Sequence, residues 1–248
     1  MIELKNKEQL AKMRVAGQIV AEVLELMKEL VKPGVTTSEL NRAAERHIKK
    51  QKAIPAFKGY NGFPATLCTS INEEVVHGIP GLRVLENGDI ISIDCGVVYS
   101  GYYGDSAITL PVGEISAERQ KLLAVCEESL KLGIAQALKG KRLFDISHAI
   151  QSYVEQNGMS VVRDYVGHGI GTKMHEEPQI PNFGKPGRGP RLEIGMALAI
   201  EPMVNLGGYE VEVLEDNWTV VTKDRKASAH FEHTVAITEN GPEILTRL

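Results

Sequence analysis

The chain has 248 residues and a formal net charge of -4, with 43% hydrophobic and 24% charged residues and a mean hydropathy of -0.13. This balance is typical of an ordinary globular protein and excludes disordered, collagen-like and coiled-coil classes. Because there is no basic excess, the charge gives no reason to expect binding to DNA.

Four segments have the apolar spacing of amphipathic helices. The first ends where Pro33 and Gly34 interrupt the pattern, and the second begins with the capping-box pair Thr36 and Glu39. The last ends before Gly158, a residue type that suits the left-handed stop of a helix. The sequence therefore predicts helices over residues 7–31, 36–52, 117–138 and 145–157.

Short β-rich runs follow each pair of helices. The sequence predicts strands over 90–98, 102–110, 196–204, 209–216, 218–223 and 230–237. Within them, Gly88–Asp94 resembles Gly195–Glu201, and this offset of 107 residues also separates Lys32 from Lys139. We interpret the order as an internally duplicated α+β domain. The alternative is that strands after turns simply look alike.

Two aspartates are predicted to meet on neighbouring strands. With a turn centred between Tyr99 and Ser100, Asp94 lies opposite Asp105 in a hairpin. Like charges at such a position, with Cβ atoms about 5 Å apart, destabilise a sheet unless a positive charge lies between them. A divalent cation meets this need, since carboxylate oxygens are suitable ligands. The alternative is that Asp105 belongs to a solvated loop edge.

Two glutamates interrupt segments that otherwise have the pattern of buried strands. Glu201 follows the run MALAI, and Glu232 lies within HFEHTVAI on the predicted face of His230 and Thr234. Buried carboxylates are costly unless they are paired or bind metal. On the opposite face, His233 is expected to be a hydrogen-bonded structural histidine.

Glycine-flanked histidines add a second kind of ligand. The segment YVGHGIGTKMHEEP contains His168 among glycines and His175 seven residues later, without the HExxH pattern of a zinc helix. Each histidine alone is more typical of a structural role, but together with four strand carboxylates they indicate a metal site. Four negative charges balance two divalent ions, of Mn, Fe, Co or Zn. Such pairs activate water and polarise carbonyl groups, which is hydrolytic chemistry.

Several motifs along the chain closely resemble those of the bacterial type I methionine aminopeptidases, members of the pita-bread fold of peptidases. They are INEEVVHGIP, SIDCG with GDSA, GHGIG followed by HEEP, AIEPMVN and AHFEHT, and the resemblance runs from about residue 5 to 247. It implies removal of an N-terminal methionine from nascent proteins when the second residue is small. It also implies one catalytic domain made of two pseudo-symmetric halves, about 1–110 and 111–248.

The resemblance also assigns roles to individual residues. It implies two divalent ions held by Asp94, Asp105, His168, Glu201 and Glu232, with Asp105 and Glu232 bridging. It implies that Glu201 shuttles a proton and that His77 and His175 contact the substrate during catalysis. The methionine side chain would be bound by Tyr60, Phe63, Cys68, Met174 and Trp218. His230 departs from the commonest pattern, because many relatives have glutamine there.

Three other readings remain open from the sequence. A proline-specific relative with the same ligands, an aminopeptidase P or prolidase, would carry a separate N-terminal domain. A non-catalytic peptide-binding protein on the same scaffold would have lost one or more ligands. An iron oxygenase with a two-histidine, one-carboxylate triad does not accommodate four carboxylates.

The expected cellular location follows from the absence of membrane, secretory and disulfide signals in the sequence. No apolar run approaches the ~18 residues of a membrane span, and the first residues contain no apolar secretory core. No CxxC pair is formed by Cys68, Cys95 and Cys126, so we expect reduced thiols. We also expect a cytoplasmic protein that works as a monomer. Transient ribosome association is expected to involve the basic residues of 185–191 or 223–226.

Overall fold

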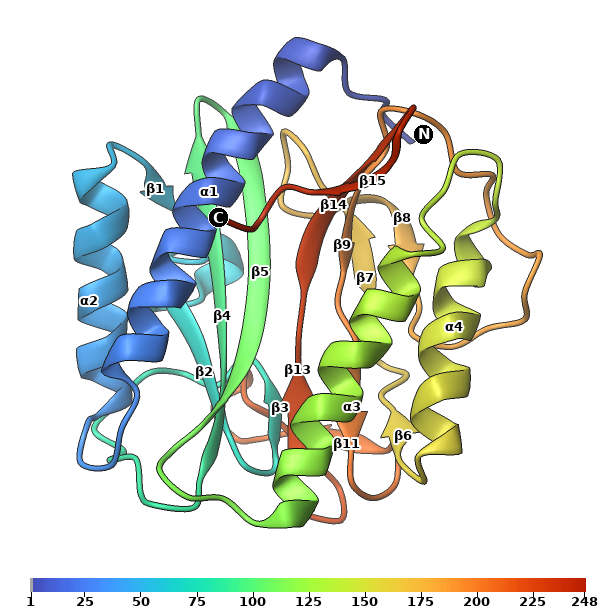
Figure 1. Cartoon of the computed structure of the whole chain (residues 1–248). Helices are drawn as coiled ribbons and strands as arrows, with labels where there is room; N and C mark the ends of the chain where they lie inside the picture. The colour runs from blue at the N-terminus through green and yellow to red at the C-terminus, as the bar shows by residue number, and fades with distance from the viewer. Residues whose placement is uncertain (1) are drawn as a thin grey trace.

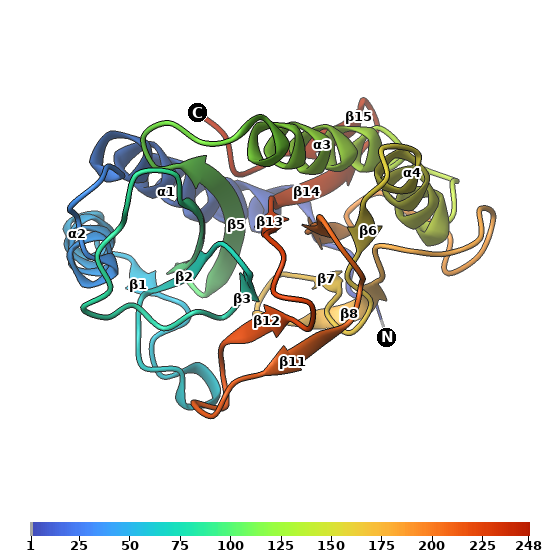
Figure 2. The same ribbon diagram turned by 90° about the horizontal axis from the view of Figure 1, so that it is seen from below.

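The computed structural model describes residues 2–248, and within them the chain folds into four α-helices and a set of curved antiparallel sheets (Figure 1). The helices are α1 (Lys7–Leu30), α2 (Thr37–Lys50), α3 (Ala117–Ile134) and α4 (Leu143–Gln156). Figure 2 shows α1, α3 and α4 on one side of the strands. The predicted order of two helix pairs, each followed by strands, is confirmed.

Local sequence signals explain where the helices begin and end. The Thr36 side chain accepts the backbone N–H of Glu39, and Glu39 accepts that of Thr36, which is the predicted capping box. α2 ends two residues earlier than predicted because Lys52 adopts a left-handed backbone, with φ of 57°. α3 ends at Ile134 rather than 138, since the following residues form turns.

The strands form four sheets. One contains β1 (Ile54–Pro55), β4 (Ile90–Tyr99) and β2 (Leu67–Ile71), with β5 (Tyr102–Pro111) paired to β4. A five-stranded sheet has the order β15 (Gly241–Ile244), β14 (His233–Thr238), β9 (Ala197–Ile200), β7 (Gly167–Gly169) and β8 (Glu176–Ile180). The first packs its apolar face against α1 and α2, and the second packs against α3 and α4.

Two smaller sheets complete the strand layer. One has the order β13 (Ser228–His230), β10 (Met203–Asn205) and β6 (Ser160–Val161). The other has the order β11 (Val211–Val213), β12 (Val220–Thr222) and β3 (Glu74–Val76). In Figure 2, β11 and β12 lie on the side of the molecule opposite α1 and α3.

The register of the β4–β5 hairpin differs from the prediction. Ser100 and Gly101 form its two-residue turn, with φ of 49° and 79°, so Tyr99 pairs with Tyr102. Positive φ at both central residues is the type I′ geometry that matches strand twist. Asp105 consequently pairs with Gly96 rather than Asp94. The predicted pairing was wrong by two residues, but a shift of two keeps both aspartates on the same face.

Two predicted strands are each broken at an acidic residue. The run 196–204 divides into β9 and β10 around Glu201, and 230–237 divides at Glu232. The breaks face each other, because Ile200 pairs with His233 and Met203 with His230. Pro202 has no N–H to donate to the ladder, which favours the interruption.

Glycine allows α1 to lie against the sheet at very short range. An added Cβ on Gly104 of β5 would lie 2.7 Å from the Gly17 nitrogen of α1. A Cβ on Gly17 would lie 2.2 Å from the Leu245 carbonyl oxygen. Glycine is costly inside a helix, so its presence at Gly17 reflects this packing requirement. No helix among residues 2–248 is long and apolar enough to cross a membrane.

We predict that Gly104→Ala lowers the free energy of unfolding by about 1–3 kcal/mol, because the methyl group overpacks the α1–β5 contact. Urea denaturation followed by circular dichroism would measure the change. The matched control is Gly81→Ala, where the nearest atom to an added Cβ is the Ile79 oxygen at 4.0 Å. Equal stability of the two variants would contradict the packing argument.

Candidate metal centre and adjoining pocket

Hydrogen bonds between β5 and the 230–234 segment bring the carboxylates of two sheets together. The Asp105 backbone N–H donates to Thr234 Oγ1 at 3.0 Å, and that hydroxyl donates to the Asp105 carbonyl oxygen at 2.8 Å. The Glu232 N–H donates to the Ala107 carbonyl oxygen at 2.9 Å. These bonds place the Asp105 carboxylate beside Glu232.

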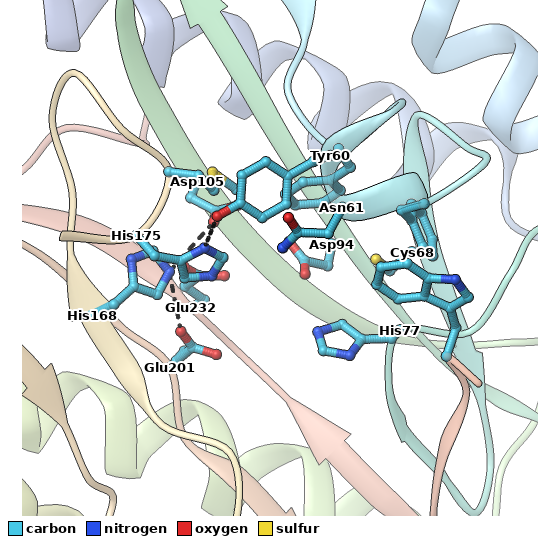
Figure 3. A pocket seen from close by; sticks show the side chains of 14 residues that line it. Tyr60, Asn61, Cys68, His77, Asp94, Asp105, His168, His175, Glu201 and Glu232 are labelled. Carbon is cyan, nitrogen blue, oxygen red and sulfur yellow. Dashed lines mark hydrogen bonds and ion pairs between the residues drawn. The ribbon is translucent and has the colours of Figure 1, made fainter. Parts of the chain in front are cut away.

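The other two acids join them from the same sheets. Asp94 lies on β4, on the face of Asp105, and Glu201 lies in the opening between β9 and β10. Asn182 Nδ2 donates to the Glu201 carbonyl oxygen at 2.9 Å, which holds the backbone of the break. The structure thus brings together the four acids that the sequence singles out (Figure 3).

This carboxylate cluster lacks a lysine or arginine partner within the described residues 2–248. Asp105 and Glu232 are 4% and 2% exposed, and across residues 2–248 no lysine or arginine forms an ion pair with any of the four acids. One oxygen each of Asp94, Asp105 and Glu232 is buried without a hydrogen-bond partner. Buried polar atoms normally have partners, so these oxygens point to a ligand.

Burial opposes the charged form of each acid. It raises the pKa of Asp94 to about 7, and it raises the pKa of Glu201 well above the ordinary range, with further repulsion from Asp105 and Asp94. The pKa of Asp105 and of Glu232 is raised in the same direction, first by burial and then by neighbouring carboxylates. Divalent cations would reverse these shifts by neutralising the cluster.

His168 is oriented as a neutral ligand. Its Nδ1–H donates to the Gly169 carbonyl oxygen at 2.9 Å, which leaves the Nε2 lone pair free. Nε2 lies 3.5 Å from Glu201 Oε1 and 3.8 Å from Asp105 Oδ2. Burial lowers the pKa of His168 to about 4. Asp105, His168 and Glu232 offer ligand atoms within 4.8 Å of one another, and the set suits a divalent metal ion.

Two further histidines near the cluster differ in their surroundings. His233 Nδ1 is hydrogen-bonded to Thr246 Oγ1 at 2.9 Å, as expected for a structural histidine. His230 Nε2 is buried without a hydrogen-bond partner and lies 3.7 Å from Glu201 Oε2. Burial lowers the pKa of His230 to about 3, so the imidazole is neutral there.

An apolar pocket opens directly beside the carboxylates. Phe63 and Trp218 meet edge to face with ring centroids 5.1 Å apart, and Trp218 also meets His77 at 6.3 Å. Cys68 and Met174 are buried in the same cluster. All twelve residues that the sequence selects line this one pocket: Tyr60, Phe63, Cys68, His77, Asp94, Asp105, His168, Met174, His175, Glu201, Trp218 and Glu232.

His175 links the pocket to the carboxylate cluster. The Tyr60 hydroxyl and His175 Nδ1 are 2.7 Å apart, and the His175 ring centroid lies 4.3 Å from that of His168 (Figure 3). Partial burial lowers the pKa of His175, so a neutral ring is favoured. With Tyr60 donating to Nδ1, the Nε2–H of His175 is free to donate to a substrate.

Two residues that line the pocket are not predicted from the sequence. They are Phe57 and Asn61, which flank Tyr60 along the chain. Asn61 has a left-handed backbone, with φ of 49°, inside the short 3-10 helix η1 (Tyr60–Gly62). The run AFKGYNGF contains aromatic residues and glycines, but no spacing in it separates a pocket wall from an ordinary turn.

Comparison with known proteins places this chain and its fold among the metallopeptidases. Residues 11–239 match the family described as Metallopeptidase family M24. The chain is 61% identical over 248 residues to "Methionine aminopeptidase 1" of Bacillus subtilis, with 100% of both chains covered. The chain therefore belongs to metallopeptidase family M24, and its high-identity relatives are methionine aminopeptidases, which confirms the predicted family.

Solved structures agree on the fold. A methionine aminopeptidase from Thermotoga maritima superposes with a TM-score of 0.99 at 48% identity, covering 100% of both chains. A prolidase from Pyrococcus horikoshii superposes with a TM-score of 0.80 at 21% identity, covering 98% of this chain and 63% of its own. The prolidase shares only the fold. The predicted α+β pita-bread architecture is confirmed.

We predict that Glu232→Gln weakens metal binding and stabilises the metal-free protein. At a pH where Glu232 is ionised in the metal-free protein, loss of its buried negative charge relieves repulsion of about 1 kcal/mol, which raises Tm by about 2–4 °C for a chain of this size. Isothermal titration with Co²⁺ and calorimetry of chelated protein would measure both effects. Glu239→Gln, on an exposed pair with Lys139, is the control and should change neither. A lower Tm together with unchanged cobalt affinity would contradict the assignment.

Proposed function

We propose that this metallopeptidase removes the N-terminal methionine from nascent proteins and peptides whose second residue is small. The observation that carries the proposal is a cluster of four carboxylates, without lysine or arginine partners among residues 2–248, beside an apolar pocket lined by Phe63, Cys68, Met174 and Trp218. The unbranched thioether of methionine fits such a pocket and packs well against aromatic edges.

In this proposal, two divalent ions would be held by Asp94, Asp105, His168, Glu201 and Glu232. When bound, the ions would supply an acidified water and polarisation of the scissile carbonyl. Three ligand oxygens without hydrogen-bond partners and the free Nε2 of His168 support this assignment. Co, Mn, Fe or Zn suits the mixed carboxylate and imidazole set.

The remaining groups bind and orient the peptide in the proposed reaction. Asp94 receives the free amine, which fixes cleavage after the first residue. His175 donates its Nε2–H to the carbonyl oxygen as negative charge develops. Glu201 holds the proton that passes to the leaving amine. His77 contacts the peptide near the scissile bond, where its packing against Trp218 and Tyr165 narrows the space for a second side chain.

We also propose that residues 1–110 and 111–248 are pseudo-symmetric halves of one catalytic domain. In each half, two helices cover three neighbouring strands, β2–β4–β5 and β7–β9–β14. Asp94 and Asp105 lie on β4 and β5, and Glu201 and Glu232 lie directly after β9 and directly before β14. Every residue that lines the pocket comes from this one chain. A monomer therefore suffices for activity in this proposal.

The activity predicts a sharp substrate preference. The metal-loaded protein should hydrolyse Met-Ala-Ser at least about 100-fold more efficiently than Met-Leu-Ser or Ala-Pro-Ser, and chelation should abolish turnover. Mass spectrometry of the products would measure cleavage. Preferred cleavage of the Ala-Pro peptide would instead identify a proline-specific peptidase.

The proton transfer assigned to Glu201 predicts the effect of one substitution. Glu201→Gln should lower kcat by about 100-fold or more, since the amide cannot shuttle a proton. Activity of Glu201→Gln equal to that of the unsubstituted chain, at equal metal content measured by atomic absorption, would refute this role. Glu215→Gln, an exposed glutamate near Trp218 in sequence, is the control.

An enzyme that acts on nascent chains makes transient contact with the ribosome. We propose that the 185–191 segment of this protein provides that contact. Lys185, Arg188 and Arg191 are exposed there, whereas Arg225 of the other basic segment pairs with Glu212. We expect Lys185→Glu/Arg188→Glu to reduce cosedimentation with ribosomes at low salt without affecting cleavage of Met-Ala-Ser. Unchanged cosedimentation would rule out this segment.

A further inference from the structure

A short loop between β7 and β8 carries two residues of the proposed substrate site. Residues 170–175 include Met174, in the pocket wall, and His175, beside the carboxylate cluster. Few main-chain bonds hold the loop: the Ile170 N–H donates to the Ala197 carbonyl oxygen at 3.1 Å, the Tyr103 N–H to that of Gly171 at 2.9 Å, and the Gly171 N–H to that of Lys173 at 3.2 Å. The shape of the loop therefore depends on side chains.

The carboxylate of Glu176 provides most of that support. Its Oε1 accepts the backbone N–H of Thr172 at 2.8 Å and that of Lys173 at 3.1 Å. Its Oε2 pairs with the ammonium group of Lys5. One carboxylate thus closes the loop on itself and ties it to the N-terminal segment, 171 residues away in sequence.

The Lys5 side chain is closely packed where it contacts this carboxylate. Its own N–H donates to the Gly195 carbonyl oxygen at 2.7 Å, and its Nζ donates to the Glu3 carbonyl oxygen at 3.0 Å. An added Cβ on Gly171 would lie 2.3 Å from Lys5 Cε and 2.7 Å from Glu176 Oε1. The lysine stem therefore lies directly against the loop backbone.

The pair is buried, unlike the other lysine and arginine pairs among residues 2–248. The Lys5 and Glu176 side chains are 4% and 8% exposed, compared with 44% and 37% for Arg14 and Glu243. Burial alone would raise the pKa of Glu176, but the bonds from Lys5, Lys173 and Thr172 lower it overall. Removing one partner of a buried pair leaves an uncompensated charge, which disrupts the surroundings strongly.

We propose that Lys5 is a positioning residue for the peptidase reaction, acting through Glu176 to hold Met174 against the methionine side chain and His175 against the carbonyl oxygen. This inference rests on the proposed function. Lys5 lines neither the pocket nor the metal centre, so its effect on catalysis passes entirely through the loop. Small displacements of such groups are costly, because catalysis requires close alignment of the reacting atoms.

The central test replaces Lys5 with an uncharged side chain of similar length. Lys5→Met should lower kcat/KM for Met-Ala-Ser by about tenfold or more, with weaker binding of free methionine, because loop geometry governs both pocket and oxyanion contacts. Cobalt stoichiometry and affinity should stay unchanged, since none of the five proposed ligands lies within residues 170–175. Arg14→Met, which removes the exposed pair with Glu243, is the matched control and should leave kcat/KM within about twofold.

Two further variants separate positioning from a loss of stability. Lys5→Arg keeps the charge and should recover more activity than Lys5→Met. Lys5→Met/Glu176→Gln contains no buried uncompensated charge, so it should regain thermal stability while kcat/KM stays low. Full recovery of kcat/KM in this double variant would overturn the proposal. Unchanged kcat/KM in Lys5→Met would also overturn it, and so would a fall in the kcat/KM of Lys5→Met that is explained by reduced cobalt content. Absence of Met-Ala-Ser cleavage by the unsubstituted chain would instead refute the proposed function.

Discussion

Repulsion among four carboxylates is the interaction around which this structure is organised. Hydrogen bonds of two sheets hold Asp94, Asp105, Glu201 and Glu232 close together. The core packing of α1 to α4 therefore supports an arrangement that the acids alone would oppose. Cations that neutralise the cluster bind the folded chain alone, so metal binding and folding stability are linked.

The sequence predicts the face of each acid better than its exact partner. Asp94 and Asp105 share a face because side chains alternate along a strand, and this holds for any register shift by two. The pairing itself depends on whether Tyr99–Ser100 or Ser100–Gly101 forms the turn. Both choices contain plausible turn residues, and only the left-handed conformation of Ser100 decides between them. The residue pattern itself singles out the four acids, His168 and His175, whereas the other six predicted pocket residues come from the resemblance to the family.

What the sequence could not reveal depends on contacts between distant segments. The breaks at Glu201 and Glu232 occur opposite each other, so each is explained by the other strand rather than by its own residues. The pairing of Lys5 with Glu176 joins the N-terminal segment to a loop near the middle of the chain, and no periodicity connects them. Phe57 and Asn61 reach the pocket through an irregular turn with no repeat to detect.

Within residues 2–248, the side chains around the centre provide no positive charge to neutralise it. Burial lowers the pKa of His77 and His168 to about 4 and that of His230 to about 3, so these imidazoles are uncharged near neutral pH. Lys5, which lies close in space to the His175 loop, is paired with Glu176 instead. Because the described chain supplies polar and apolar walls but no positive charge, the four acids stay available to divalent ions.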